Sequence, residues 1–265
     1  ILTTKLDDAK HYGRIIRNES NEVIGIVEAK DASPDQIEIN EINTAIYCFK
    51  APVLRRYLDA ISNDNAQGEY YLTDVIGLMH ADGCKLGSFV TDDTDAVLGI
   101  NDRVELAAQT AKIRRKILQM HMLNGVTVVD PESTYIDIDV QIGQDTVLNP
   151  QTYIEGQSVV GQNCIVGPSA RLSNMKVGDN VTIIFSNLTD STIGNGTKVG
   201  PFAHLRPGCV IGNSVKIGNF VETKNAAIED RVSIGHLSYV GDASVGEHTN
   251  IGAGTITCNY DGFRK

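Results

Sequence analysis

The chain has 265 residues, a formal net charge of −10 and a pI near 5.0. This acidic balance argues against nucleic acid or an anionic membrane surface as a partner, because both attract basic protein faces. No apolar run approaches the roughly 20 residues that span a bilayer, and no signal peptide opens the chain. The 5 cysteines are widely spaced without a C-x-x-C pair, which indicates neither a disulfide framework nor a zinc site. We therefore expect a soluble cytoplasmic protein.

The first part of the chain combines strand and helix signals. Its expected buried strands are Val23–Val27, Asn43–Phe49 and a strand that begins at Ser88–Val90. Its expected helices are Ala51–Asn63 and Leu72–Ala81. Because strands alternate with helices, we expect residues 1–101 to form part of an α/β domain with a mainly parallel sheet.

A long helix is expected next, from Asp102 to about Asn124. Asn101 is the expected N-cap, and Gly125 supplies the stop. Four apolar residues lie near one face, as in a connector packed along its length: Leu106, Ile113, Ile117 and Met120. We interpret residues 102–124 as the connection to a repeat domain at 125–265.

An aliphatic residue recurs with a period of six in this repeat domain. The register holds at Ile136, Ile142, Leu148, Ile154, Val160, Val166 and Leu172. It resumes from Ile193 to Ile217 and, after one-residue slips, from Ile228 to Ile251. A period of six fits neither a helix nor a single flat strand, and it predicts a solenoid in which three hexapeptides form one triangular coil.

Small residues four positions after each aliphatic are expected to fill the inside of the same prism. Examples are Thr146, Ser158, Cys164, Ala203, Cys209 and Ala227. The two cysteines are therefore interpreted as packing residues, because a free cysteine behaves as a small buried hydrophobe.

Two cations do not fit the inward pattern. Arg206 and Lys224 are eighteen residues apart without a register slip, so we expect them to stack on adjacent coils. Two stacked cations repel unless an anion bridges them, which favours a phosphate site. The alternative is a pair of solvated surface charges balanced by Glu222 or Asp242.

His236 is expected to point outward, two residues after an inward aliphatic. The register places the small residue Ala253 beside it on the next coil, which leaves space for a substrate. A histidine there could act as a general base toward an amine or a hydroxyl.

Three segments of the repeat carry a specific resemblance: Gly218–Lys224, Gly235–Asp242 and Asn250–Gly262. They closely resemble the bifunctional bacterial family of glucosamine-1-phosphate N-acetyltransferases and N-acetylglucosamine-1-phosphate uridyltransferases. The resemblance continues in the first domain, in order, through Tyr12–Ile15, Gly25–Glu28, Glu41–Thr44, Gly68–Tyr71 and Gly99–Asn101. It implies the C-terminal part of a Rossmann-like nucleotidyltransferase domain, then a left-handed parallel β-helix that forms a homotrimer. That hand is an exception to the usual crossover rule.

The resemblance also implies roles for the matching residues. His236 would deprotonate the 2-amine of glucosamine-1-phosphate for attack on acetyl-CoA. The implied sugar-phosphate contacts are Arg206, Lys224, Tyr239 and Asn250, and the implied acetyl-CoA contacts are Ala253, Asn259 and Tyr260. The implied UDP-sugar contacts are Gly13, Glu28, Asn43 and Asn101. Asn101 would also bind Mg²⁺, for uridylyl transfer from UTP to N-acetylglucosamine-1-phosphate to give UDP-N-acetylglucosamine for cell-envelope synthesis.

The sequence departs from the family pattern toward both ends. The family's nucleotide loop, L-x-x-G-x-G-T-x-M, and a second Mg²⁺-binding aspartate are not in this sequence, nor are the later coils and C-terminal helix that complete the acetyl-CoA site. We interpret the chain as truncated at both ends and predict no uridyltransferase activity for it. The incomplete acetyl-CoA site argues against acetyl transfer by the chain alone.

Two other functions stay open. A hexapeptide-repeat carbonic anhydrase would place three histidines on one zinc ion, but His204, His236 and His248 fall on different sides of the expected prism. A scaffold protein that kept the two-domain shape is the non-catalytic alternative. The joint presence of the acetyltransferase residues argues against it.

Overall fold

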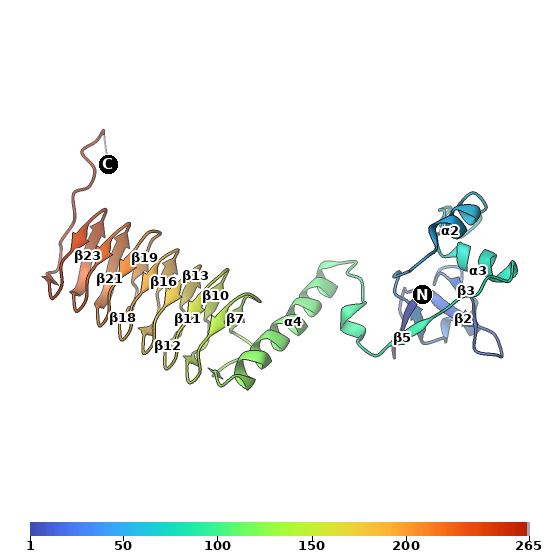
Figure 1. Cartoon of the computed structure of the whole chain (residues 1–265), viewed down its shortest axis with the longest axis horizontal. Helices are drawn as coiled ribbons and strands as arrows, with labels where there is room; N and C mark the ends of the chain where they lie inside the picture. Colours follow the sequence, from blue (N-terminus) through green and yellow to red (C-terminus); the bar gives the residue numbers. More distant parts are fainter. Residues whose placement is uncertain (264–265) are drawn as a thin grey trace. The chain divides into compact units, whose positions relative to one another are not determined.

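The computed structural model of the chain describes residues 1–263. It contains two compact units, Ile1–Leu106 and the residues from Ala107 onward (Figure 1). Within residues 1–263, no helix combines the length and the apolar character needed to cross a membrane.

The first unit is a five-stranded sheet with short helices. Its strands are β1 (Leu2–Lys5), β2 (Arg14–Arg17), β3 (Val23–Val27), β4 (Glu41–Asn43) and β5 (Phe89–Thr91), in the order β3-β2-β4-β1-β5. Its helices are α1 (Pro34–Ile37), α2 (Ala51–Leu58), α3 (Asp74–Ala81) and the 3₁₀ turn η1 (Thr94–Ala96). The core forms where α3 buries Val75, Ile76 and Met79 against β2 and β3.

The expected mainly parallel sheet is wrong. Only β1 and β5 pair in parallel, whereas the pairs β1–β4, β2–β4 and β2–β3 are antiparallel. The five residues between β2 and β3 are too few for a parallel crossover, so the two strands form a hairpin. The expected strand from Asn43 to Phe49 also stops at Asn43, because its side-chain Oδ1 accepts the amide of Ala45 at 3.0 Å and turns the chain.

The expected long helix is confirmed as α4 (Arg103–Leu123), but its cap is not Asn101. The Oδ1 atom of Asp102 accepts the backbone amides of Val104 and Glu105, each at 2.8 Å. Asp102 therefore satisfies the first free amides of the helix, and the side chain of Asn101 is available for other contacts. Gly125, with φ +91°, ends the helix as expected.

The apolar face of α4 is buried over its last turns only. Leu118 is buried in the solenoid core and Ile117 packs against it. Leu106, Ile113 and Met120 are exposed, so the expectation of packing along the whole length is wrong for a single chain.

The second unit is a parallel β-solenoid with three faces (Figure 1). The first face contains β6 (Thr127–Val128), β9 (Val147–Leu148), β12 (Ile165–Val166), β15 (Thr182–Ile183), β18 (Lys198–Val199) and β25 (Asn250–Ile251). The second contains β7 (Tyr135–Ile136), β10 (Tyr153–Glu155), β13 (Arg171–Ser173), β16 (Asn187–Thr189) and β19 (His204–Leu205). The third contains β8 (Gln141–Ile142), β11 (Val159–Val160), β14 (Lys176–Val177), β17 (Thr192–Ile193), β20 (Val210–Ile211), β22 (Ala227–Ile228) and β24 (Ser244–Val245).

Two longer strands, β21 (Lys216–Lys224) and β23 (Ser233–Gly241), bend around the corner from the first face to the second. The period-six aliphatics pack inside the prism as predicted, although Ile142, Val245 and Ile251 are only partly buried. Cys164 and Cys209 are buried in the same core. The inward slot expected for Ala227 is filled by Ala226 instead. The register slips by one residue at this coil, so the small inward residue comes one position earlier.

Candidate functional site

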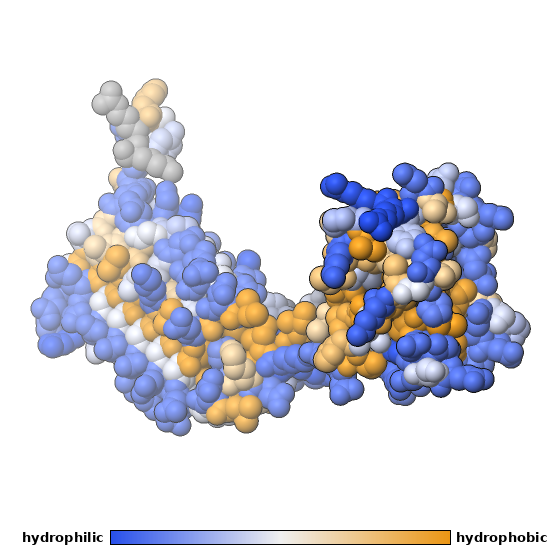
Figure 2. Space-filling view, turned by 45° about the vertical axis from the view of Figure 1, so that its right-hand side comes forward, coloured by the Kyte–Doolittle hydropathy of each residue, from blue (hydrophilic) through white to orange (hydrophobic). Residues whose placement is uncertain are grey.

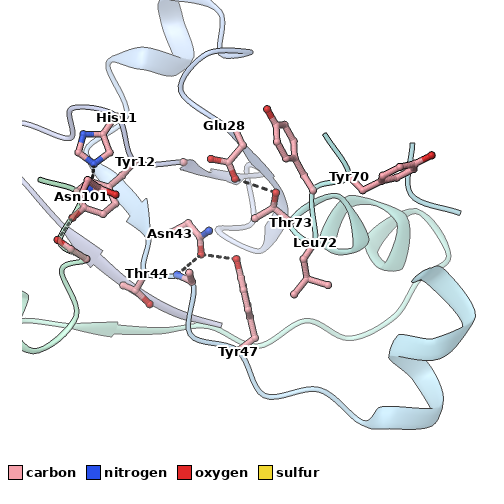
Figure 3. A pocket seen from close by; sticks show the side chains of 14 residues that line it. His11, Tyr12, Glu28, Asn43, Thr44, Tyr47, Tyr70, Leu72, Thr73 and Asn101 are labelled. Carbon is pink, nitrogen blue, oxygen red and sulfur yellow. Dashed lines mark hydrogen bonds between the residues drawn. The ribbon is translucent and has the colours of Figure 1, made fainter. Parts of the chain in front are cut away.

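A cavity of about 520 Å³ lies in the first unit, at the sheet edge where β2 begins and β3 and β4 end. Gly13 precedes β2, Glu28 follows β3 and Asn43 ends β4, so the antiparallel pairing brings all three to this edge. Asn101, just before α4, completes the set (Figure 3). The four residues assigned by resemblance to a UDP-sugar thus line one pocket.

Hydrogen bonds orient the polar groups of this pocket. Glu28 Oε1 accepts the hydroxyl of Thr73 at 3.1 Å, and Asn43 Oδ1 accepts the hydroxyl of Tyr47 at 2.9 Å (Figure 3). Burial raises the pKa of Tyr47, which keeps this donor protonated. A Cβ atom on Gly13 would lie 3.1 Å from Glu28 Oε2, so the glycine leaves room for that carboxylate.

The Oδ1 atom of Asn101, rather than its Nδ2 atom, is the side-chain group available to a ligand. Its Nδ2 atom lies 2.7 Å from His11 Nε2 and donates to Glu105 Oε2 at 3.2 Å. Mg²⁺ takes about six oxygen ligands in octahedral geometry. In residues 1–263, no group of three or more His, Cys, Asp or Glu side chains converges. One carboxamide oxygen does not make a magnesium site, so the described residues do not fit this ion by themselves.

Sequence reasoning assigned no site role to several residues that shape this pocket, although Tyr70 lies in the quoted segment Gly68–Tyr71. His11, Tyr47, Tyr70 and Thr73 line it. The loop that carries His11 is held by the buried guanidinium of Arg14, which donates to the carbonyl oxygens of Lys10 at 3.1 Å and Ala9 at 3.3 Å and also to that of Tyr12. The spacing of residues in the sequence does not indicate these contacts, because they join strand β2 to the loop that directly precedes it.

A second group of site residues lies on the second face of the solenoid. Leu205 pairs with Thr223, so Arg206 and Lys224 follow in register on adjacent coils, which confirms the expected stacking. Arg206 Nη1 also donates to Glu222 Oε1 at 2.9 Å. The alternative of a charge balanced by Glu222 is therefore realised for Arg206. Both side chains of this pair are about 40% exposed, at 41% and 39%, and such a pair contributes at most about 1 kcal/mol.

His236 is exposed on β23, as predicted, and pairs with Asn219 on the preceding coil. The offset to the following coil is 17 residues, since Ile234 pairs with Ile251. The same offset places Ala253 next to His236, in agreement with the sequence-based expectation.

Tyr239 and Asn259 approach each other at the edge of the second face. A Cβ atom on Gly241 would lie 2.3 Å from the Tyr239 hydroxyl oxygen, so this glycine allows the ring to lie over the strand. The Nδ2 atom of Asn259 donates to that hydroxyl at 3.4 Å. One end of this face therefore carries four of the predicted site residues: Arg206, Lys224, Tyr239 and Asn259.

Two of the predicted site residues lie elsewhere. Asn250 is on β25 of the first face, where it pairs with Ser233. Tyr260 is exposed on the segment beyond β25, and its hydroxyl donates to the carbonyl of Gly262 at 2.9 Å. A single chain thus brings together only some of the residues predicted for acetyl transfer.

Comparisons with known proteins show what this chain is similar to. A family model described as bacterial transferase hexapeptide (six repeats) matches residues 139–174 and 190–225. The bifunctional protein GlmU of Brevibacillus brevis is 51% identical over 265 residues, which are 100% of this chain and 58% of that protein. The chain is a GlmU homologue. GlmU of Mycobacterium avium and of Mycobacterium bovis are 50% and 46% identical, again over 100% of this chain and 54% of each relative.

The homologous region spans just over half the length of these GlmU proteins. Among solved structures, the UDP-N-acetylglucosamine acyltransferase of Francisella novicida gives a TM-score of 0.38 at 15% identity, over 49% of this chain and 62% of that one. The acetyltransferase domain of PglB from Neisseria gonorrhoeae in complex with acetyl coenzyme A gives 0.33 at 17% identity, over 62% and 85%. Likeness at this level supports no argument about function.

Proposed function

We propose that this chain contributes to a bifunctional enzyme that first transfers an acetyl group from acetyl-CoA to glucosamine-1-phosphate. Uridylyl transfer from UTP to the resulting N-acetylglucosamine-1-phosphate would then give UDP-N-acetylglucosamine for cell-envelope synthesis. The observation that carries the proposal is the stack of Arg206 and Lys224 beside Tyr239 in a GlmU homologue. A cytoplasmic location belongs to the same proposal.

The acetyl step would use the exposed groups at this end of the solenoid. His236 would take a proton from the sugar 2-amine as its nitrogen attacks the thioester carbon. The C–S bond then breaks, and the coenzyme A thiolate leaves and is protonated. Arg206 and Lys224 would hold the sugar phosphate, which competes with Glu222 for Arg206.

The remaining predicted contacts complete this proposal. Tyr239 and Asn250 would contact the sugar, while acetyl-CoA would contact Ala253, Asn259 and Tyr260. In the first unit, the cavity with Gly13, Glu28, Asn43 and Asn101 would bind the UDP-sugar, with carboxylate and amide oxygens as acceptors for sugar hydroxyls. The described residues do not by themselves provide the ligands of Mg²⁺.

Assembly into a homotrimer through the β-helix is also proposed. Phe185, Phe202 and Phe220 stack at one corner with ring centroids 5.6 and 5.5 Å apart, and they are 41%, 55% and 56% exposed. They adopt φ values of 46°, 59° and 56°, a region that bulky residues avoid. Figure 2 shows apolar surface on the solenoid among hydrophilic residues. A second copy that covers such rings would remove them from water.

The acetyl step is tested by following thiol release from acetyl-CoA with a chromogenic reagent, using the native gene product and glucosamine-1-phosphate. We expect His236→Ala to reduce turnover by at least about 100-fold, as for loss of a general base. His248→Ala, at another exposed histidine, is the matched control and should keep the wild-type rate. Full turnover by His236→Ala would refute the base assignment. A wild-type protein that releases no thiol would refute the function.

A further inference from the structure

Asp242 links two coils at the edge of the proposed acetyl site. Its Oδ1 atom accepts a hydrogen bond from Asn225 Nδ2 at 2.7 Å on the preceding coil. Its Oδ2 atom accepts from the side-chain amide of Asn259 on the following coil. The carboxylate therefore receives one amide donor from each side.

The same corner carries a matched contact away from the site. Asn174 Nδ2 donates to Asp190 Oδ1 at 3.0 Å. Asp190 and Asp242 have φ values of 44° and 48°, so both occupy the left-handed region that Asp and Asn tolerate. An Asp→Asn change at either position keeps this backbone preference and replaces one carboxylate oxygen with an uncharged amide donor.

Asp242 determines which end of the Asn259 carboxamide faces outward. Nδ2 of Asn259 is directed at Asp242 and also donates to the Tyr239 hydroxyl at 3.4 Å, which uses both of its hydrogens. The remaining group is the carbonyl oxygen, which accepts from an N–H donor. We propose that Asp242 is a positioning residue that locks Asn259 as a hydrogen-bond acceptor for an amide N–H of the acetyl donor. This inference rests on the proposed acetyl transfer, since the pantetheine arm of acetyl-CoA carries two amide N–H groups.

The backbone around Asn259 is held without Asp242. Thr257 donates its amide to the carbonyl of Tyr239 at 3.0 Å. Its hydroxyl accepts the amide of Gly241 at 2.8 Å and donates to the Gly241 carbonyl at 3.0 Å. Loss of the Asp242 carboxylate should therefore release the Asn259 side chain while the segment stays in place.

The test compares Asp242→Asn with the control Asp190→Asn. In Asp242→Asn, the new side chain has one acceptor oxygen for the two amide donors of Asn225 and Asn259. Its NH₂ group then faces one of these donors and repels it, so Asn259 loses its fixed orientation. We expect the KM for acetyl-CoA to rise about tenfold in the native gene product, as for loss of one neutral hydrogen bond, with kcat and the KM for the sugar phosphate nearly unchanged. Asp190→Asn should leave all three constants at wild-type values.

A second measurement needs no turnover. In the NMR spectrum of this chain, the Asn259 side-chain NH₂ signals should move toward free-amide values and exchange faster with solvent in Asp242→Asn but not in Asp190→Asn. Unchanged Asn259 signals, or equal KM changes in both variants, would overturn the positioning role. A wild-type protein without acetyl transfer would instead refute the proposed function, and the NMR result would still decide how Asn259 is held.

Discussion

Gly218 is the position where one added methyl group should most directly disturb the coil that carries His236. Gly218 lies on β21 and its neighbour Gly235 lies on β23, and the two strands pair in parallel on either side of this point. A Cβ atom on Gly218 would lie 1.7 Å from the carbonyl oxygen of Gly235. Cβ atoms essentially never approach closer than 3.0 Å, so the backbones must separate by about 1.3 Å (3.0 − 1.7). Such a gap is large beside a strand spacing of about 4.8 Å.

The expected cost of Gly218→Ala has two parts. Separation of β21 from β23 weakens about two backbone hydrogen bonds, each with a net value of about 1 kcal/mol. Strain in the surrounding packed coils adds about 1 to 3 kcal/mol. We therefore expect a loss of about 3 to 5 kcal/mol in the free energy of unfolding and a fall of about 10 °C in the melting temperature of the solenoid.

Circular dichroism during thermal and urea unfolding measures this loss, and Gly235→Ala is the control. A Cβ atom on Gly235 has no heavy atom within 4 Å, so this variant should differ from wild type by less than about 1 kcal/mol. If Gly218→Ala unfolds at the same urea concentration as Gly235→Ala, the coils accommodate the added methyl group without a loss in the free energy of unfolding. The steric reasoning would then be refuted.

Two further predictions concern buried titratable groups. His121 is buried, its Nε2 atom has no hydrogen-bond partner within residues 1–263, and burial lowers its pKa. The unfolded chain therefore binds the proton first. The unfolding free energy should fall by up to about 1.4 kcal/mol per unit as pH drops below about 6.5, and urea unfolding at pH 7.5 and 5.5 should show a smaller change for His121→Leu. Burial also raises the pKa of Cys164, so iodoacetamide followed by mass spectrometry should label the exposed Cys48 and Cys258 in the native protein. Early labelling of Cys164 would contradict its place in the core.

The solenoid could be predicted in detail because each coil repeats the same local choice. An aliphatic residue every six positions and a small residue between them determine which side chains enter the prism, including Cys209. The stacking of Arg206 and Lys224 followed from counting alone. The exception at Ala226 has the same origin, since one slipped residue moves the inward position by one.

The sheet of the first unit could not be predicted in this way. β1 pairs with β5 although Thr3 and Val90 are far apart in sequence, and a strand of four residues carries too little pattern to identify its partner. The pocket depends on this pairing, because antiparallel neighbours bring Gly13, Glu28 and Asn43 to one edge. Resemblance identified these residues, but their shared edge was not part of the expectation.

The amino-acid sequence alone determined the three-sided coil, its buried residues and the outward positions of His236 and the two stacked cations. These follow from a short repeat whose side chains face in or out by position. Only the tertiary structure decided that Asp102 rather than Asn101 caps α4, that Glu222 pairs with Arg206, and that Asp242 orients Asn259. Each of these outcomes is a competition between several possible hydrogen-bond partners, and distances in the folded chain select among them.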